Sequence, residues 1–300
     1  MTTLRLLIAA GLLPASVPVP GQVHPDFSIN ARLVIVPVTV TDHRGAFVNG
    51  LSRASFAIAE DGVAQQIRSF SEDDAPVSIG VVMDLSGSMR NLTGWEAEAL
   101  RAFAMTSNPG DEAFLNTVST RPRQGAGFSG NLDAVINGVA FAGASGSTAL
   151  IDTIWLSLSE LRAGRHARKA LLVISDGMDN HSRYSRTELL NRAMEADAQI
   201  YAVCIFNAPR NAKPIELVEP QRGMALLAEL AQSTGGMDYV IRDRDGIQGT
   251  MTSISRGLRN QYNIGFIPAN AALDGRWRRI QVRVAGNGLK AHARAGYRRD

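Results

Sequence analysis

The chain has 300 residues, of which 45% are hydrophobic and 20% charged, the ordinary balance of a soluble globular protein. This length allows one large domain, or one large domain and a small one. The formal net charge of +3 is too small to indicate a nucleic-acid partner, and we expect none. The single cysteine, Cys204, excludes an intrachain disulfide, and its apolar neighbours predict a buried thiol.

The first 23 residues resemble a secretory signal peptide. Arg5 precedes an apolar run from Leu6 to Leu13, and small and proline-rich residues follow. A run of this length is too short to cross a bilayer, which takes about 20 apolar residues. We therefore predict cleavage between Ala15 and Val23. The mature chain would be exported (periplasmic, cell-surface or secreted) and have no integral membrane span. An uncleaved anchor and a disordered tail are the alternatives.

Segments with β character lie at both ends of the remaining chain. Residues 32–42 alternate between apolar and polar side chains, and Pro37 among them suggests an edge strand. Asp61-Gly62 joins two short runs as a hairpin. Three more strands are predicted near the C-terminus, at 261–268, 276–284 and 289–297.

Between residues 75 and 258 strands alternate with helices. The run at 77–84 is apolar almost throughout, as expected for a strand covered on both faces. Helices are predicted at 94–107, 147–162, 186–197, 224–234 and 245–258, the second with Leu150, Ile154, Leu158 and Leu161 on one stripe. Further strands are predicted within 108–119, 167–177, 198–206 and 237–241. These repeated units predict a doubly wound, mostly parallel sheet of the Rossmann-like class.

The simplest organisation that accommodates both patterns is an insertion. An α/β domain at 75–258 would be inserted into a small β-sandwich formed by residues 30–72 together with 260–300. Two unrelated β segments at the two ends are the alternative.

Oxygen-bearing side chains occur where the predicted strands end. Asp84, Ser86 and Ser88 follow the first α/β strand, Thr148 begins a helix, and Asp176 follows the next long strand. In a doubly wound sheet, ligands bind beyond the carboxyl ends of the strands. Two carboxylates and three hydroxyls are donors that Mg²⁺ accepts, and they leave room for a further ligand. Each residue also has a simpler interpretation, as a helix cap or as part of a turn.

The pattern D-x-S-x-S at 84–88, with a threonine at 148 and an aspartate before glycine at 176, resembles a known site. It is similar to the metal-ion-dependent adhesion site (MIDAS) of von Willebrand factor type A (VWA) domains, and the flanking β segments resemble a bacterial exported group of VWA-related proteins. The resemblance implies a VWA domain with a bound Mg²⁺, Mn²⁺ or Ca²⁺ ion. Hydroxyls would come from Ser86, Ser88 and Thr148. Asp84 and Asp176 would bind the ion directly or through water, and a protein partner's carboxylate would complete the shell.

Further charged residues are expected around this site. Asp179 should order the loop after Asp176 or support the ligands, and Asp152 should be an ordinary helix residue. The segment Asn207–Arg222 follows a strand end and is either part of the rim or a solvated insertion. Basic rim residues would speed the approach of an acidic partner. Those expected are Arg90, His181 and Arg183.

We expect no catalysis. The motifs G-x-S-x-G, H-E-x-x-H and G-x-x-x-x-G-K-[ST] are absent from the sequence. An aspartyl-phosphate hydrolase could use Asp84 as its nucleophile. Such enzymes resemble one another in a D-x-D motif, and position 86 is serine here, so the general acid is missing. The sequence thus predicts a non-enzymatic, metal-dependent binding or adhesion module. The alternatives are a structural or assembly module with a vestigial metal site and, less favoured, an Asp-dependent phosphohydrolase.

Overall fold

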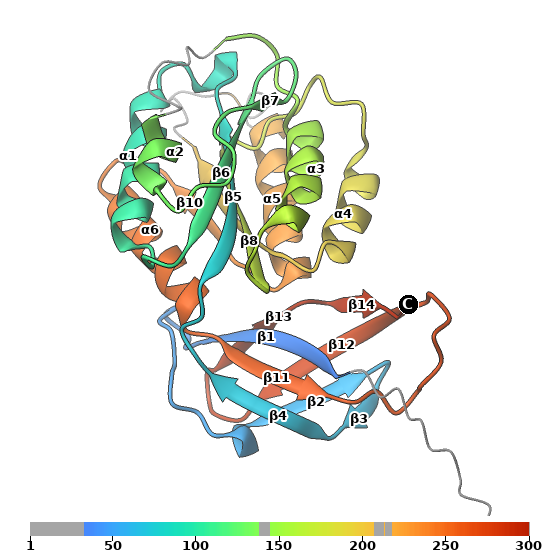
Figure 1. Ribbon diagram of the computed structural model, residues 1–300. Coiled ribbons are helices and arrows are strands. Elements are labelled where there is room, and N and C mark those ends of the chain that lie inside the picture. The colour runs from blue at the N-terminus through green and yellow to red at the C-terminus, as the bar shows by residue number, and fades with distance from the viewer. Residues whose placement is uncertain (1–32, 138–144, 207–212, 214–217, 300) are drawn as a thin grey trace, which may run out of the picture. The chain divides into compact units, whose positions relative to one another are not determined.

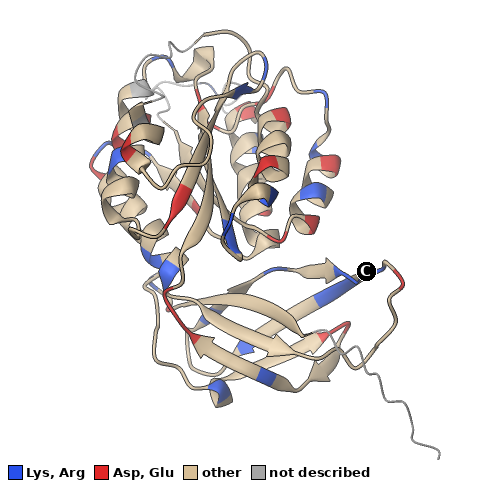
Figure 2. Cartoon of the chain, viewed as in Figure 1, with Lys and Arg blue, Asp and Glu red and all other residues tan. Residues whose placement is uncertain are grey.

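The computed structural model describes residues 33–137, 145–206, 213 and 218–299. The signal peptide-like segment 1–23 and most of the segment 207–222 lie outside the described residues. An α/β region occupies the middle of the chain, and two antiparallel sheets come from its two ends (Figure 1). Lys and Arg are interspersed with Asp and Glu over both regions, as the small net charge predicts (Figure 2).

The α/β region is organised around a six-stranded sheet in the order β10-β9-β8-β5-β6-β7. Neighbouring strands are parallel except for β7, which is antiparallel to β6. β5 and β9 are buried along their whole length, which explains their uninterrupted apolar sequences. The strands are β5 (Val77–Asp84), β6 (Glu112–Val118), β7 (Arg123–Gln124), β8 (Arg168–Ser175), β9 (Gln199–Ile205) and β10 (Asp238–Ile241).

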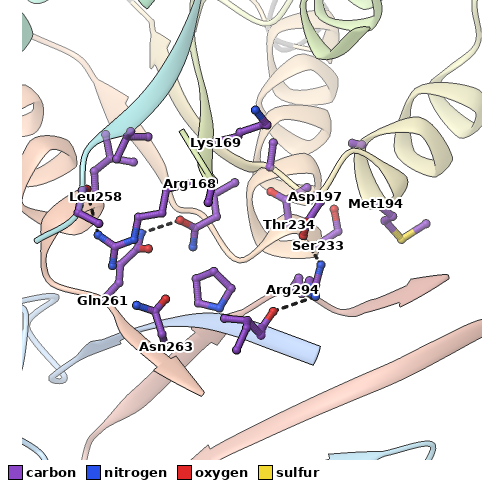
Figure 3. Close-up of a pocket in the computed structure, with 18 of the residues that line it drawn as sticks. Arg168, Lys169, Met194, Asp197, Ser233, Thr234, Leu258, Gln261, Asn263 and Arg294 are labelled. Atoms are coloured by element: carbon purple, nitrogen blue, oxygen red, sulfur yellow. Dashed lines mark hydrogen bonds and ion pairs between the residues drawn. The ribbon is translucent and has the colours of Figure 1, made fainter. Parts of the chain in front are cut away.

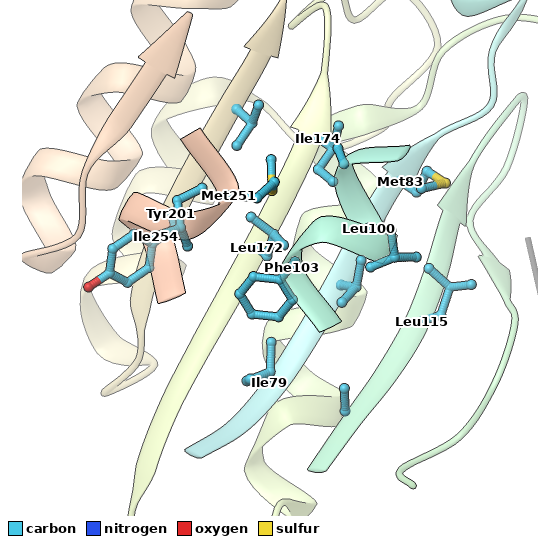
Figure 4. Packing of buried hydrophobic residues seen from close by; sticks show 14 of the residues in the cluster. Ile79, Met83, Leu100, Phe103, Leu115, Leu172, Ile174, Tyr201, Met251 and Ile254 are labelled. Atoms are coloured by element: carbon cyan, nitrogen blue, oxygen red, sulfur yellow. The ribbon is translucent and has the colours of Figure 1, made fainter. Parts of the chain in front are cut away.

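Helices cover both faces of this sheet, so the predicted doubly wound fold is confirmed. α1 and α6 pack on one face, where Leu100, Phe103 and Met251 belong to a single apolar cluster (Figure 4). α3, α4 and α5 cover the other face, and the predicted apolar stripe of the 147–162 helix is buried there. Among the described residues, none of the helices is long and apolar enough to cross a membrane. The helices are α1 (Thr93–Thr106), α2 (Leu132–Asn137), α3 (Leu150–Glu160), α4 (Arg186–Glu195), α5 (Val218–Thr234) and α6 (Gly246–Arg259).

The chain ends form two four-stranded antiparallel sheets, in the orders β13-β1-β11-β4 and β14-β12-β2-β3. Both sheets combine strands from the two ends, because β1 pairs with β11 and β2 pairs with β12. Their apolar side chains share one core, in which the rings of Phe56, Phe70 and Tyr262 are in contact. The sandwich predicted from both chain ends is therefore confirmed. Its strands are β1 (Val34–Thr41), β2 (Phe56–Glu60), β3 (Val63–Gln65), β4 (Ile67–Glu72), β11 (Tyr262–Phe266), β12 (Trp277–Val284), β13 (Lys290–Ala293) and β14 (Gly296–Arg298).

Three details of the sandwich differ from or refine the sequence prediction. The Asp61-Gly62 hairpin between β2 and β3 is present, with both residues at positive φ. Pro37 stands at an edge position as predicted, although β1 as a whole lies between β13 and β11. Pairing with β13 begins only at Val38. At Pro37 the strand has β11 as its one neighbour, so the N–H that proline lacks is not needed for pairing. The run predicted as one strand at 289–297 is two strands in different sheets, β13 and β14.

A pocket of about 470 Å³ lies at the amino ends of the α/β strands (Figure 3). Its lining includes Val77, Arg168 and Gln199, which are the first residues of β5, β8 and β9. Gln261, just before β11, donates a hydrogen bond to the Gln199 side-chain oxygen at 2.6 Å. Because Asp84 is the last residue of β5, this pocket is separate from the site predicted at the carboxyl ends.

The loop that follows β8 is held by backbone contact with α5. Gly177 has φ 81°, and a Cβ added to Gly223 would lie 2.1 Å from the Gly177 carbonyl oxygen. Only two glycines can approach each other this closely, so α5 determines where the chain goes after Asp176.

We expect Gly223→Ala to destabilise the fold by about 1–3 kcal/mol, because the added methyl overpacks this contact. The matched control is Gly249→Ala in α6, also a helical glycine, where an added Cβ meets nothing within 4 Å. The control should gain about 0.5–1 kcal/mol from helix propensity. Urea unfolding followed by circular dichroism measures both changes, and equal gains in the two variants would contradict the contact.

Candidate metal site

The central feature of the site is the pairing of β5 with β8. The strands run parallel, with Met83 opposite Ile174, so Asp84 and Ser175 end them side by side. The chain passes from β5 to β6 on one side and later returns to β8 on the other. Asp84 and Asp176 therefore lie at the topological switch point, where doubly wound sheets bind ligands.

The Asp84 side chain is fully buried and held by two hydrogen bonds. Its Oδ1 accepts from the Ser86 N–H at 3.0 Å, and its Oδ2 accepts from the Ser175 hydroxyl at 2.5 Å. Burial raises the pKa of Asp84 from 3.8 to about 6, against the lowering effect of the Ser175 and Ser86 hydrogen bonds, and the nearby Asp176 carboxylate raises it further. Ser175 was not predicted as a site residue, although its place at the end of the neighbouring strand puts it there.

The turn after β5 presents the two serines. Ser86 is buried and Ser88 is exposed, and their hydroxyl oxygens lie 3.1 Å apart. Neither serine side chain caps a helix. Ser86 is the N-cap residue of the short 3-10 helix Gly87–Met89, but its hydroxyl makes no capping hydrogen bond, and the N-cap of α1 is Leu92. The alternative interpretation of this pair as a helix cap is therefore not supported.

Gly87 lies between the two serines and is required by a close backbone approach. Its N–H donates to the Gly146 carbonyl at 3.1 Å, and an added Cβ would lie 3.1 Å from the same oxygen. The segment before α3 is thereby held against the serine turn.

Thr148 stands just before α3 and is bound to the loop that follows Asp176. Its N–H donates to the Asn180 side-chain oxygen at 2.9 Å, and its carbonyl accepts from the N–H groups of Asn180 and His181 at 3.0 Å. The N-cap of α3 is Ala149 and has no side-chain cap, so Thr148 does not serve as one. The threonine and the second aspartate loop are thus joined by three hydrogen bonds.

The Asp176 carboxylate is buried, and it accepts a backbone hydrogen bond from its own loop. Its Oδ1 accepts from the Met178 N–H at 2.9 Å. The Cys204 thiol, buried as predicted, donates to the Asp176 carbonyl at 3.6 Å. Asp84, Ser86, Thr148 and Asp176 are therefore all buried at one end of the sheet, with Ser88 at its exposed side.

The residues predicted around the site have structural partners. Asp179 accepts from the Ile151 N–H at 3.1 Å and from the Ser182 hydroxyl at 2.5 Å, so it joins its loop to the first turn of α3. Asp152 is on α3 and accepts from the backbone N–H groups of Arg183 and Tyr184. The Arg183 side chain is 85% exposed and pairs with Asp152 at 3.3 Å. Two further residues predicted for the rim, Arg90 and His181, are exposed.

Glu96 is a buried carboxyl group that the sequence prediction missed. Its side chain on α1 has 0% exposure, and neither carboxyl oxygen has a hydrogen-bond partner. Burial raises its pKa well above the ordinary value, and the charges of Asp84 and Asp176 raise it further. The signal was present in the sequence, because Glu96 precedes Ala99, Leu100 and Phe103 at helical spacing on the buried face of α1.

The donor set fits a divalent cation that binds oxygen. In the described part of the chain, the ion pairs do not include Asp84, Glu96 or Asp176. Three buried carboxyls without a cationic partner are costly, and a bound cation would offset that cost. No three His, Cys, Asp or Glu side chains among residues 33–137, 145–206, 213 and 218–299 are grouped so as to hold a metal by themselves. Hydroxyls and water would have to complete the shell, as Mg²⁺ permits.

The raised pKa of Asp84 makes the stability of the metal-free protein depend on pH. The unfolded chain loses this proton near pH 3.8 and the folded chain near pH 6. The stability contributed by the group is complete below pH 3.8 and declines as the pH rises to about 6. Above that pH the buried anion opposes folding in full.

We expect Asp84→Asn, in EDTA, to melt a few degrees above wild type at pH 8, because it removes a buried anion. A gain in stability of about 1–2 kcal/mol would raise the melting temperature by roughly 2–4 °C for each kcal/mol. The difference should shrink or reverse at pH 5. The control is Asp133→Asn, at an exposed position on α2, which should differ from wild type in melting temperature by the same small amount at pH 5 and at pH 8. A gain that is equal at pH 5 and pH 8 would show that Asp84 is not a buried anion.

No protein-family model matches the sequence, and no curated protein matches it. Similar solved structures include the pilus adhesin SpaC of Lactobacillus rhamnosus GG in its open conformation, with a TM-score of 0.50, 10% identity and coverage of 83% of this chain and 48% of that chain. A von Willebrand factor type A protein from Catenulispora acidiphila has a TM-score of 0.49, 13% identity and coverage of 91% and 76%. The hypothetical protein BatB from Bacteroides thetaiotaomicron has a TM-score of 0.45, 12% identity and coverage of 60% and 98%.

At these identities the likeness concerns the fold alone. The chain thus has a doubly wound α/β region, with helices on both faces of a mostly parallel sheet, that is inserted between strands forming an antiparallel sandwich.

Proposed function

We propose that this chain is an exported, non-enzymatic binding module that uses a MIDAS-type ion to bind an acidic group of a protein partner. The ion would be Mg²⁺, with Mn²⁺ or Ca²⁺ as substitutes. Its ligands would be Asp84, Ser86, Ser88, Thr148 and Asp176. The observation that carries the proposal is the burial of Asp84 and Asp176 at adjoining strand ends, together with three hydroxyl residues and without a cationic partner among the described residues.

Electrostatics supports a cation at this place. Two carboxylates balance the charge of a divalent ion and leave positions for hydroxyls, water and one ligand from outside. The exposed side of the turn is marked by Ser88. An incoming carboxylate would reach the ion from that side.

The environment of Asp84 favours binding over catalysis. A nucleophilic aspartate has to reach its substrate, but this side chain is fully buried and both oxygens accept hydrogen bonds. Position 86 is serine, so the second aspartate of a D-x-D phosphohydrolase is missing. The same hydrogen bonds suit a carboxylate that holds an ion in a fixed position.

The surroundings favour an acidic partner. Arg90, His181 and Arg183 are exposed on segments that adjoin the site, and basic groups there would raise the association rate of a negatively charged surface. A role in adhesion or assembly outside the cytoplasm is the setting we propose. SpaC, whose fold is similar, is a pilus adhesin.

We expect millimolar Mg²⁺ or Mn²⁺ to raise the melting temperature of the wild-type chain by roughly 5 °C or more. A ligand at 100 times its Kd that binds only the folded state stabilises it by about 2.7 kcal/mol. EDTA should reverse the shift, and Asp84→Ala and Asp176→Ala should abolish it. Asp133→Ala, an exposed aspartate on α2, should keep it.

Two outcomes would contradict the proposal. A wild-type chain that shows no shift at millimolar ion would have a vestigial site, as in a structural or assembly module. Hydrolysis of p-nitrophenyl phosphate that is lost in Asp84→Asn would support the phosphohydrolase.

A further inference from the structure

Glu96 is a buried carboxyl group that the proposed ligand set does not use. It lies in the first turns of α1, which follows the serine turn directly, and its side chain is completely buried. Neither of its oxygens accepts or donates a hydrogen bond within the described residues. A polar group in this state costs about 1–3 kcal/mol, and more if charged.

Packing does not explain a glutamate at this position. On the buried face of α1 the next residues, Ala99, Leu100 and Phe103, are apolar and belong to the cluster shared with α6. An apolar side chain of similar size would continue that face without leaving two oxygens unpaired. The carboxyl group therefore lowers the stability of the metal-free fold, and its presence points to a partner that the chain itself does not supply.

Consecutive backbone hydrogen bonds connect Glu96 to the serine turn, because its N–H donates to the Leu92 carbonyl at 3.1 Å, the Leu92 N–H to Met89 at 2.7 Å, and the Met89 N–H to Ser86 at 3.1 Å. The charges of Asp84 and Asp176 both act on Glu96 and, after burial, are what raise its pKa. Glu96 therefore lies on the turn of α1 that is bonded to the serine turn, and its buried carboxyl is within reach of the charges of both site aspartates. Buried carboxylates that act on one another repel, and a cation near them would offset that repulsion.

We propose that Glu96 belongs to the metal site of this chain and accepts a hydrogen bond from a water molecule bound to the ion. This inference rests on the proposed function, because it requires the ion to be there. Glu96 is thus a positioning residue, which orients metal-bound water and adds negative charge to the site. It makes the site bind a divalent cation more tightly than the five motif residues alone would.

Contact through water fits this arrangement better than direct ligation. Asp84, Glu96 and Asp176 are not grouped closely enough to form a three-carboxylate cluster by themselves. Mg²⁺ and Mn²⁺ usually keep several waters, and such waters need acceptors. Residues that hold the ligands or waters of a metal in this way typically contribute 10- to 100-fold to metal affinity.

The test is a titration of the full chain with Mn²⁺, in which free Mn²⁺ is measured by electron paramagnetic resonance. We compare wild type with Glu96→Gln, which keeps the size and removes the charge, and expect a Kd about 10- to 100-fold weaker. The matched control is Glu98→Gln, two residues along the same helix, where the glutamate side chain is 39% exposed and pairs with Arg244. The control should bind Mn²⁺ within about twofold of wild type, although it loses the same charge.

Thermal melts in EDTA separate this role from a structural one. We expect Glu96→Gln to melt at or above the wild-type temperature without metal, since a buried carboxyl has been removed, and to gain less from Mn²⁺. A Kd within twofold of wild type would overturn the proposal, and a lower metal-free melting temperature with unchanged affinity would assign Glu96 to the fold. If Glu96→Gln fails to fold, Glu96→Leu fills the same buried space and is judged by the same Kd criterion.

Asp84→Ala distinguishes the two proposals. If wild type binds Mn²⁺ and Asp84→Ala does not, but Glu96→Gln binds like wild type, the site stands and the role of Glu96 is wrong. If wild type binds Mn²⁺ no better than Asp84→Ala, the metal site itself fails, and the inference about Glu96 fails with it.

Discussion

The hydrogen bond from the Ser175 hydroxyl to the Asp84 carboxylate, at 2.5 Å, joins the ends of the two central strands. It fixes a buried carboxylate at the one place where the direction of the winding changes. The other parts of the site are arranged around it. The serine turn continues from β5, the loop with Asp176 continues from β8, and Thr148 is tied to that loop by hydrogen bonds to Asn180 and His181. A carboxylate without this partner would be costly to bury, and the site would have no fixed centre.

The loops at this end are held by backbone contacts more than by side chains. Gly87 approaches the carbonyl of Gly146, and Gly177 approaches Gly223 of α5. Asp179 and Asp152 bind backbone N–H groups of segments about 30 residues away in the chain. Such contacts share the work of shaping the loops with the motif carboxylates, which accept only one loop N–H each, from Ser86 and from Met178. Such support from residues outside the motif is what a preorganised site requires.

Much of this could be predicted from the sequence, because it depends on local patterns. Continuous apolar runs predicted the parallel strands, and the apolar stripe from Leu150 to Leu161 predicted α3. Asp61-Gly62 predicted the hairpin between β2 and β3. The split of the last run into β13 and β14 was not predictable, because alternation along the chain does not say which sheet a strand joins. Pro37 correctly indicated one-sided pairing at its own position, but it could not show that β13 joins β1 from Val38 onward. At the site, the motif residues were found by their spacing. Ser175 and Glu96 were missed because their importance comes from neighbours on other elements.

The manner in which the α/β region is attached has a mechanical consequence. The chain enters it from β4, which ends at Glu72, just before β5 begins at Val77, and leaves it from α6, which ends at Arg259, just before β11 begins at Tyr262. Both crossings are short and lie at the amino ends of the strands, whereas Asp84 lies at the carboxyl end of β5. A pull on the sandwich would therefore be divided between two covalent links on the side away from Asp84. If a partner is bound at the loops that carry Ser86, Thr148 and Asp176, the load would enter there and run the length of the α/β strands to these two links.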